Sequence, residues 1–328
     1  MSENSNSYIN GRGAQSNPTN RFDKNGYSNE EETHDNPHDF LAKPTRYIDV
    51  YPKSIVNKVA SPDVGMDYSL NPYQGCEHGC TYCYARPTHE YWGYSAGMDF
   101  EQIIMVKQNA ADLLRTTFEK KSWKVKPIVL SGNTDCYQPC EKKFEITRQL
   151  LEVFLEYRHP VGIITKNVLL NRDLDIIEEL AKLRLIVVNI SITTLNEELR
   201  RKLEPRTATG ARKLELIERL VKLDVPVNVL ACPIIPALND HEILNIAKST
   251  AARGAHSFHA HMVRLMGPNE AIFEDWLEHN FPDRKAKVLN QLKSIHIGKT
   301  GSSTFGERQT GSGSFAENIM RQREIAKN

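Results

Sequence analysis

Between about residues 43 and 297, short hydrophobic runs rich in valine and isoleucine alternate with longer segments in which hydrophobic residues recur at helical spacing. The short runs are typical of buried strands, and the longer segments are typical of helices with one hydrophobic face. This alternation predicts an α/β fold of six βα units around a parallel sheet. The expected strands span residues 68–72, 127–130, 161–165, 185–192, 225–231 and 257–265.

Two helical segments show the pattern clearly. Residues 173–183 place their hydrophobic side chains on one side, and residues 141–157 do the same. In the second segment that side carries Phe144, Leu150, Leu151, Phe154 and Tyr157. We expect both hydrophobic faces to pack into the core.

The two ends of the chain lack this periodicity. Residues 1–42 are polar, which predicts a mobile arm; alternatively, the segment from Gly11 to Phe22 folds over an active site or contacts a polyanion. Residues 298–328 form a C-terminal extension, Gly/Ser-rich as far as residue 314 and helical from about 316 to 325. The glycines favour a flexible linker, and a loop that grips phosphate is the alternative. The domain organisation is therefore an arm (1–42), a core (43–297) and an extension (298–328).

The composition narrows the class of protein. The chain has 328 residues, 40% hydrophobic, with a formal net charge of +1. It lacks the strong positive charge of a nonspecific nucleic-acid binder. Its first residues are polar and no run is long enough to span a bilayer, so we expect no export signal. Six cysteines, three of them clustered, fit reduced thiols better than a disulfide framework. We expect a cytoplasmic enzyme.

The three clustered cysteines, Cys76, Cys80 and Cys83, have the spacing C-x3-C-x2-C. Such a loop can hold three corners of a cubane iron–sulfur cluster, whereas electron carriers usually supply four cysteines. The fourth iron then stays open to a substrate or cofactor, as in catalytic zinc sites. Zinc is the alternative, but it needs a fourth ligand. His78 would be strained in that role because it lies inside the same short loop.

Polar residues at the carboxyl ends of the expected strands are the next candidates, because βα barrels place their chemistry there. Thr134 follows the second strand, Lys166 ends the third, and Ser191 lies in the fourth. Lys166 can pair with a carboxylate, and Ser191 can donate or accept a hydrogen bond. A solvated loop or a capping role is the alternative for each.

These residues together resemble the radical SAM superfamily, in the branch near spore photoproduct lyase. The resemblance rests on the C-x3-C-x-aromatic-C motif, in which Tyr82 is the aromatic residue, on the Thr134-Asp135 pair, and on Lys166 and Ser191. The segment from Leu203 to Thr207 and Arg212 also match.

This resemblance implies a partial (β/α)6 barrel and a [4Fe-4S] cluster bound by Cys76, Cys80 and Cys83. Tyr82, Thr134, Lys166 and Ser191 would hold S-adenosyl-L-methionine. The reaction would be reductive cleavage of this cofactor to a 5′-deoxyadenosyl radical that abstracts hydrogen from a substrate, in lyase-like chemistry. The electron would come from an external donor of the flavodoxin or ferredoxin type.

One departure from the lyase pattern concerns the hydrogen donor. The lyases have a cysteine just before a Thr-Ser-Asp run, and this chain has Gly132 there. Cys136 is the first candidate for the catalytic thiol, followed by Cys140 and Cys232. A structural role is the alternative for each of the three.

The substrate stays open between a nucleic acid and a protein, peptide or metabolite. A cluster carrier or electron-transfer module is the alternative from another class. His259 and His261 share one face of the sixth strand, where they would bind substrate or pack in the core.

Overall fold

The structure is a computed structural model that describes residues 8–22 and 44–326. The rest of the predicted mobile arm, residues 1–7 and 23–42, lies outside the described residues, as do residues 43, 327 and 328.

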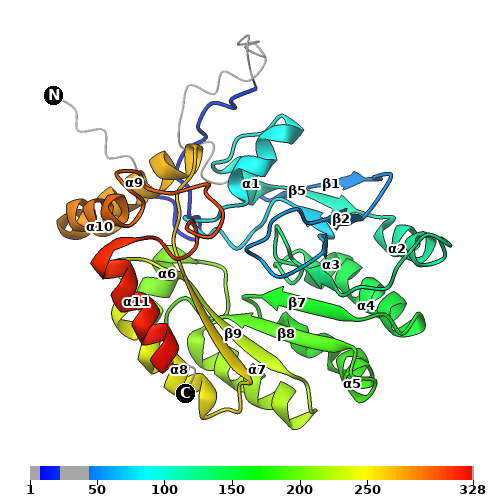
Figure 1. The fold of residues 1–328 in the computed structure, drawn as a ribbon. Coiled ribbons are helices and arrows are strands. Elements are labelled where there is room, and N and C mark those ends of the chain that lie inside the picture. Colours follow the sequence, from blue (N-terminus) through cyan, green and yellow to red (C-terminus); the bar gives the residue numbers. More distant parts are fainter. Residues whose placement is uncertain (1–7, 23–43, 327–328) are drawn as a thin grey trace, which may run out of the picture.

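A seven-stranded sheet forms the centre of the molecule, in the order β10-β9-β8-β7-β6-β3-β2 (Figure 1). Neighbouring strands run parallel except β2, which pairs antiparallel with β3 at one edge. The six parallel strands are the six expected from the sequence, so the predicted partial (β/α)6 architecture is confirmed. The strands are β2 (Val56–Lys58), β3 (Tyr68–Leu70), β6 (Ile128–Leu130), β7 (Val161–Thr165), β8 (Ile186–Ser191), β9 (Val227–Ile234) and β10 (Ser257–Met262).

Helices follow the strands and cover one face of the sheet, here called the outer face (Figure 1). The helices after the strands are α3 (Glu141–Phe144), α4 (Ile146–Glu156), η3 (Leu169–Asp173), α5 (Leu174–Lys182), α6 (Glu197–Leu203), α7 (Gly210–Lys222), η4 (Asp240–Glu242) and α8 (Ile243–Ala251). The remaining helices are η2 (Arg86–Trp92), α1 (Asp99–Gln102), α2 (Ala110–Phe118), α9 (Pro268–Asn280), α10 (Pro282–Ile295) and α11 (Gly313–Ile325).

The single helix expected over residues 141–157 is wrong in one respect. Glu145 has φ 53°, in the left-handed region, and it separates α3 from α4. The Glu141 side chain accepts the Thr147 N–H at 3.0 Å, so it caps the second helix. The hydrophobic periodicity continues across this break and therefore does not reveal it.

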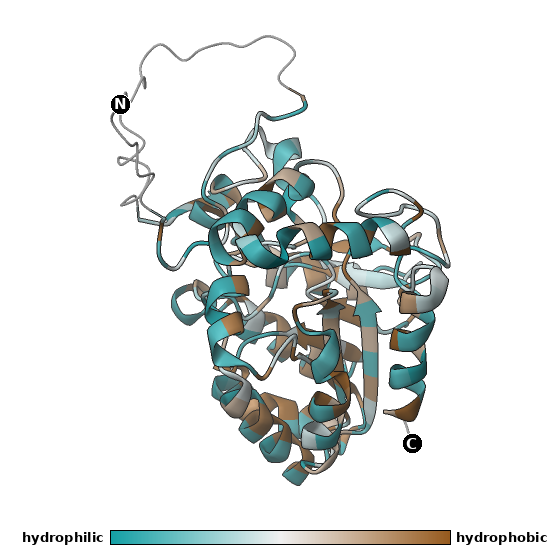
Figure 2. Cartoon of the chain, turned by 90° about the vertical axis from the view of Figure 1, so that its left-hand side faces the viewer, coloured by the Kyte–Doolittle hydropathy of each residue, from teal (hydrophilic) through white to brown (hydrophobic). Residues whose placement is uncertain are grey.

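The strands alternate between the two faces of the sheet, which explains the core. Ile163, Val188 and Val229 are fully buried against the outer helices, whereas Asn189 and Asn228 are half-buried on the opposite face. This opposite face is called the inner face below. Hydrophobic residues gather on the strands and on the helix surfaces that face them (Figure 2).

A smaller sheet supports the cysteine loop. It has the order β1-β5-β4 and consists of β1 (Arg46–Val50), β5 (Ile103–Lys107) and β4 (Tyr73–Gln74). Strand β4 ends two residues before Cys76, and the Cys76 N–H donates to the Phe100 carbonyl at 2.8 Å. The cysteine loop is therefore anchored to this sheet and to α1.

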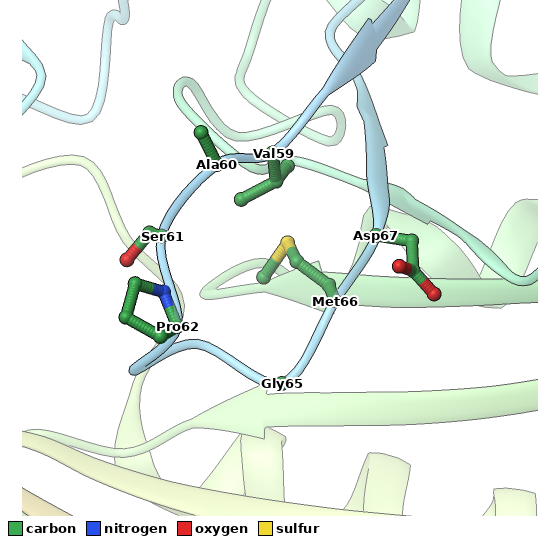
Figure 3. Close-up of a pocket in the computed structure, with 7 residues that line it drawn as sticks. All are labelled: Val59, Ala60, Ser61, Pro62, Gly65, Met66 and Asp67. Atoms are coloured by element: carbon green, nitrogen blue, oxygen red, sulfur yellow. The ribbon is translucent and has the colours of Figure 1, made fainter.

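The C-terminal extension connects the two edges of the large sheet. The Met262 N–H at the end of β10 donates to the Gln309 carbonyl at 2.9 Å. Arg308 donates to Asp63 at 2.8 Å and to Ser61 in the loop between β2 and β3. That loop surrounds a small hollow into which the Met66 side chain points (Figure 3). Among the described residues, no helix is long and apolar enough to cross a membrane.

Candidate functional site

The cysteine loop brings three free thiols into one buried region. Cys76 and Cys80 are each 7% exposed, and Cys83 is half-buried. Burial and, to a smaller extent, the nearby Cys76 raise the pKa of Cys83 to about 11. Burial also raises the pKa of Cys80 well above its usual value, with Glu204 and the other two cysteines acting in the same direction. The three sulfurs are therefore close enough to interact.

This donor set fits the cluster that the sequence predicts. Buried thiols with raised pKa values become thiolates only where a positive charge compensates them, and cluster irons supply that charge. The three cysteines account for three corners of a cubane, and the loop offers no fourth thiol.

The zinc alternative needs a fourth ligand, and His78 is poorly placed to be one. Its Nδ1 lies 3.3 Å from the Asp135 carboxylate and its Nε2 lies 3.3 Å from the Asn167 amide nitrogen. Burial would lower the pKa of His78, but Asp135 raises it to about 10. Within residues 8–22 and 44–326, no three His, Cys, Asp or Glu side chains are arranged to hold a single metal ion.

A buried hydrogen-bond network lies beside Cys80 and contains two of the predicted cofactor residues. The Lys166 Nζ lies 2.9 Å from Glu204 Oε1 and 3.0 Å from Thr193 Oγ1, and the Tyr82 hydroxyl also donates to Glu204. Lys166 lies 5.7 Å from the centre of the Tyr82 ring. The network therefore joins the cysteine loop to the ends of β7 and β8.

Electrostatics explain why this network stays charged although it is buried. Burial would raise the pKa of Glu204, but Lys166 and Lys213 hold it well below its usual value. Burial would lower the pKa of Lys166, but Glu204 raises it above its usual range. Burial prevails for Lys213, whose pKa falls to about 8. Lys166 therefore already has a carboxylate partner within the protein.

The other two predicted cofactor residues differ in their surroundings. The Thr134 hydroxyl donates to the Tyr73 carbonyl at 2.7 Å, and its N–H donates to Asn71 at 3.2 Å. Ser191 ends β8 on the inner face, and its hydroxyl has no hydrogen-bond partner among the described residues. Thr134 therefore supports the strand before the cysteine loop, whereas Ser191 is free to bind a ligand.

The candidate hydrogen donors lie on opposite faces of the sheet. Cys136 is fully buried and Cys140 is 2% exposed, both within the core under the outer helices. Cys232 is half-buried on the inner face, on the same side of β9 as Asn228 and Leu230. Its carbonyl accepts from Thr193 at 3.0 Å and from Lys166 at 3.3 Å. The backbone of Cys232 thus contacts the cofactor network, and its thiol donates to the His259 carbonyl at 3.8 Å.

The inner face of β8, β9 and β10 carries a chain of polar side chains, here called the strand wall. The Asn228 amide donates to Asn189 at 3.1 Å, Ser257 donates to Asn228 at 2.6 Å, and Ser257 lies 3.2 Å from His259 Nε2. His261 follows on the same face with its Nδ1 buried and unpartnered among the described residues. Burial lowers the pKa of His261 to about 4, with Arg323 adding to the effect.

Cationic and aromatic side chains lie near the end of β10. Tyr84, one residue after Cys83, is 55% exposed and its hydroxyl donates to the Gly132 carbonyl at 2.9 Å. Arg264 is half-buried and has no hydrogen bond or ion pair within the described part of the chain. Burial lowers the pKa of Arg264, and the nearby Arg308 lowers it further.

Sequence reasoning assigned no role to several residues that organise the site. Glu204 and Thr193 are the centre of the cofactor network, and Asp135 joins His78 to the Lys166 N–H at 2.8 Å. Glu204 and Asp135 both lie in motifs that carry the family resemblance, so a signal was present for these two. Arg86 and Glu101 form a buried pair at 2.5 Å, and no sequence motif marks them.

Comparisons with known proteins find relatives that cover most of this chain. An uncharacterised protein of Mycobacterium tuberculosis is 33% identical over 240 residues, which cover 72% of this chain and 71% of that protein. An uncharacterised protein of Methanocaldococcus jannaschii is 27% identical over 244 residues, 74% of this chain and 87% of that protein.

Among solved structures, spore photoproduct lyase complexed with dinucleoside spore photoproduct superposes with a TM-score of 0.62 at 14% identity, covering 85% of this chain and 78% of that chain. That likeness shows a shared fold. The sequence profile of the radical SAM superfamily matches residues 70–250, including all three clustered cysteines. The chain belongs to the radical SAM superfamily and is an enzyme.

Proposed function

We propose that this enzyme abstracts a hydrogen atom from a nucleic-acid substrate held against the inner face of the sheet, in lyase-type chemistry. One observation carries the proposal: Tyr82 of the cysteine loop and Lys166 at the end of β7 bind the same carboxylate, Glu204, and Lys166 also donates to the Cys232 carbonyl at 3.3 Å. Bound there, the [4Fe-4S] cluster and S-adenosylmethionine supply a 5′-deoxyadenosyl radical by reductive cleavage of the sulfonium. The alternative of a cluster carrier does not agree with an enzyme of this superfamily.

The chain's own residues bind and orient the cofactor. Cys76, Cys80 and Cys83 hold the cluster, and Tyr82 lies beside Cys80 in the same hydrophobic group. Ser191 offers a free hydroxyl, and Lys166 sets a positive charge at the end of β7 while Glu204 keeps it protonated. Thr134 fixes the strand before the loop.

The first experiment tests the reaction class. Anaerobically reconstituted protein, reduced with dithionite, should convert S-adenosylmethionine into 5′-deoxyadenosine. The Cys83→Ala variant should not. Failure of the wild-type protein to form 5′-deoxyadenosine, with a full cluster present, would contradict the proposed reaction.

The hydrogen donor of this proposal is Cys232. Its S–H bond breaks, a C–H bond forms on the product radical, and the sulfur radical left behind is reduced by one electron from the external donor and one proton. Cys232→Ala should leave 5′-deoxyadenosine formation intact and lower the ratio of product to 5′-deoxyadenosine. Cys136→Ala, on the outer face, is the matched control. If the ratio of product to 5′-deoxyadenosine falls only in Cys136→Ala, then Cys136, the residue predicted from the sequence, is the hydrogen donor.

Charge and aromatic surface support the nucleic-acid substrate. Arg264 offers an unpaired guanidinium and Tyr84 an exposed ring next to the cysteine loop, which suit a phosphate and a stacked base. The fold is shared with spore photoproduct lyase, whose solved complex contains a dinucleoside photoproduct.

The test is binding of fluorescent single- and double-stranded DNA, measured by anisotropy at several salt concentrations. Arg264→Gln should weaken binding about tenfold, the usual effect of one charge-assisted contact. Lys248→Gln, an exposed change on the outer helix α8, should leave binding unchanged. Equal binding by wild type and Arg264→Gln would favour a protein or metabolite substrate.

The proposal includes an external electron donor of the flavodoxin or ferredoxin type and a cytoplasmic location. All six cysteines are free thiols in the structure, which suits a reducing compartment. Reduction by a flavodoxin with its reductase, in place of dithionite, tests the donor. If flavodoxin and ferredoxin, each with its reductase, both fail to support 5′-deoxyadenosine formation in protein that forms it with dithionite, this class of donor is wrong.

A further inference from the structure

The N-terminal segment 8–22 packs against the cysteine-loop region although it is far away in sequence. Figure 1 shows it in dark blue near α1. Ile9 and Ala14 form a small hydrophobic group with Ala96, Met98 and Ile272 of α9. The residues from Gly11 to Ala14 are called the N-terminal clip below.

The clip binds a buried carboxylate through its backbone. The Gly13 N–H donates to Glu101 Oε2 at 3.0 Å, and the Ala14 N–H donates to Glu101 Oε1 at 2.8 Å. The Arg12 guanidinium donates to the Glu101 carbonyl at 2.9 Å and is itself buried. One residue, Glu101, therefore receives three bonds from three consecutive residues of the clip.

The same carboxylate is connected to the cysteine loop through Arg86. Arg86 and Glu101 are both fully buried and lie 2.5 Å apart. The Arg86 Nε donates to the Cys80 carbonyl at 2.9 Å, and its Nη1 donates to the Gly97 carbonyl at 2.9 Å. A continuous set of charge-assisted bonds thus runs from the clip to the backbone of a cluster ligand.

The clip also touches the loop directly. A Cβ added to Gly13 would lie 1.8 Å from the Gly79 carbonyl oxygen, so only glycine fits at this approach. Gly79 lies immediately before Cys80 and has φ 68°. Arg206 contacts both segments: its side-chain Nε donates to the Gly11 carbonyl at 3.1 Å, and its backbone N–H donates to the His78 carbonyl at 3.3 Å. Arg206 therefore connects the clip to the loop.

We propose that the N-terminal clip is a positioning element of the cluster site, which fixes the cysteine loop through Glu101 and Arg86 and shields the thiols from solvent. Of the two interpretations of the arm, this develops the one in which it folds over the active site. The proposal rests on the cluster assignment of the proposed function. The first measurement of the clip proposal is the reactivity of the thiols, which needs neither a cluster nor S-adenosylmethionine. The clip proposal and the proposed function can therefore fail separately.

The experiment compares Gly13→Ala with wild type in the full-length chain. Gly13 lies outside the left-handed region, so its backbone dihedrals suit alanine, and the added Cβ would meet the Gly79 carbonyl and, at 3.1 Å, Thr81 Cγ2 of the same loop. In apo-protein, alkylation of Cys80 and Cys83 by iodoacetamide, followed by mass spectrometry, should accelerate about tenfold, as expected for a local opening equilibrium shifted by about 1.4 kcal/mol. The fully buried Cys136 serves as an internal reference in the same sample.

In reconstituted protein, the same variant should lose iron to a chelator about tenfold faster and should show a changed EPR spectrum of the reduced cluster. Thr19→Ala, an exposed change in the same arm, is the matched control and should behave as wild type. The melting temperature should stay within about 2 °C of wild type, because the clip acts on the loop and not on the whole core.

A second variant, Arg12→Gln, removes the bond to the Glu101 carbonyl without introducing a clash. It should also accelerate alkylation of Cys80 and Cys83, by a smaller factor than Gly13→Ala does. If both variants leave Cys80 and Cys83 as slow as in wild type, the clip does not shield the loop and the proposal is wrong. Equal acceleration at Cys136 would show a general loss of stability and would also overturn it.

Discussion

The cysteine-loop region and the strand wall contain equally polar residues but differ in charge. Three buried ion pairs surround the loop: His78 with Asp135, Arg86 with Glu101, and Lys166 with Glu204. The strand wall joins the uncharged side chains of Asn189, Asn228 and Ser257, which are half-buried. Loss of one partner from a buried charge pair lowers the free energy of unfolding strongly, because it leaves the other charge buried and unpaired. Loss of a neutral partner near solvent lowers it much less. The contrast suits a rigid cluster site beside an adaptable substrate surface.

The largest expected effect is at the loop itself. Cys83→Ser should lower the iron content of reconstituted protein from about four to less than about one per chain, because a hydroxyl replaces a cluster ligand. Iron and sulfide analysis measures it. Cys232→Ser, which changes the inner-face cysteine, should keep the full content. Full iron in Cys83→Ser, or stoichiometric zinc in wild type, would overturn the cluster assignment.

The sequence predicted the strands well because alternation is a local property. All six parallel strands were expected, and the cysteine spacing located the loop. The ion pairs were not predictable, since their partners are distant in sequence: Lys166 and Glu204 are 38 residues apart, and Arg86 and Glu101 are 15 apart. A residue pattern does not state which distant charges the fold brings together.

The choice between Cys136 and Cys232 as hydrogen donor also depends on contacts that the sequence does not show. Alternation shows that Cys232 shares a face with Asn228 and Leu230, but it does not show whether that face is the inner or the outer one. Cys136 was ranked first because it lies near the family motif in sequence. The structure buries Cys136 in the core, whereas the Cys232 carbonyl accepts from Lys166 and Thr193, so position along the chain and position in the fold favour different cysteines.

The next effect concerns the ion pairs. Glu204→Gln should lower the free energy of unfolding of apo-protein by about 3–5 kcal/mol, because it leaves Lys166 and Lys213 without their buried carboxylate. Urea unfolding at neutral pH measures it. Glu152→Gln, at an exposed ion pair with Arg148, should cost about 0–1 kcal/mol. Similar small losses in both variants would remove the contrast between the two regions.

The sign of the pH dependence follows from the lowered pKa of Glu204. The carboxylate contributes stability above the ordinary glutamate pKa, and this contribution is lost as the pH falls toward the lower folded value. The difference between wild type and Glu204→Gln should therefore narrow on acidification. A difference that is constant with pH would show that the charge of Glu204 is not what stabilises the fold.

A smaller effect is expected at the end of the strand wall, where the pKa of His261 falls from its ordinary 6.5 to about 4. Between these values the unfolded chain binds a proton that the folded chain does not, so stability decreases as the pH falls through this range. The loss amounts to about 3 kcal/mol at most. His261→Gln should remove this part of the pH dependence, measured by urea unfolding. The exposed His241→Gln is the control, and equal slopes in wild type and His261→Gln would contradict the prediction.

The smallest expected effects separate Ser191 from Thr134, which the family resemblance treats alike as cofactor residues. Ser191→Ala removes a hydroxyl without a protein partner, so it should weaken S-adenosylmethionine binding by about 1 kcal/mol, roughly fivefold, and leave stability unchanged. Thr134→Val leaves the Tyr73 carbonyl unpaired, so it should lower the free energy of unfolding by about 1 kcal/mol. Isothermal titration of reconstituted protein and urea unfolding of apo-protein measure the two quantities separately. If Thr134→Val weakens S-adenosylmethionine binding as much as Ser191→Ala does, without loss of stability, then Thr134 also binds the cofactor. A hydrogen bond within the protein would then not distinguish a supporting residue from a binding residue at this site.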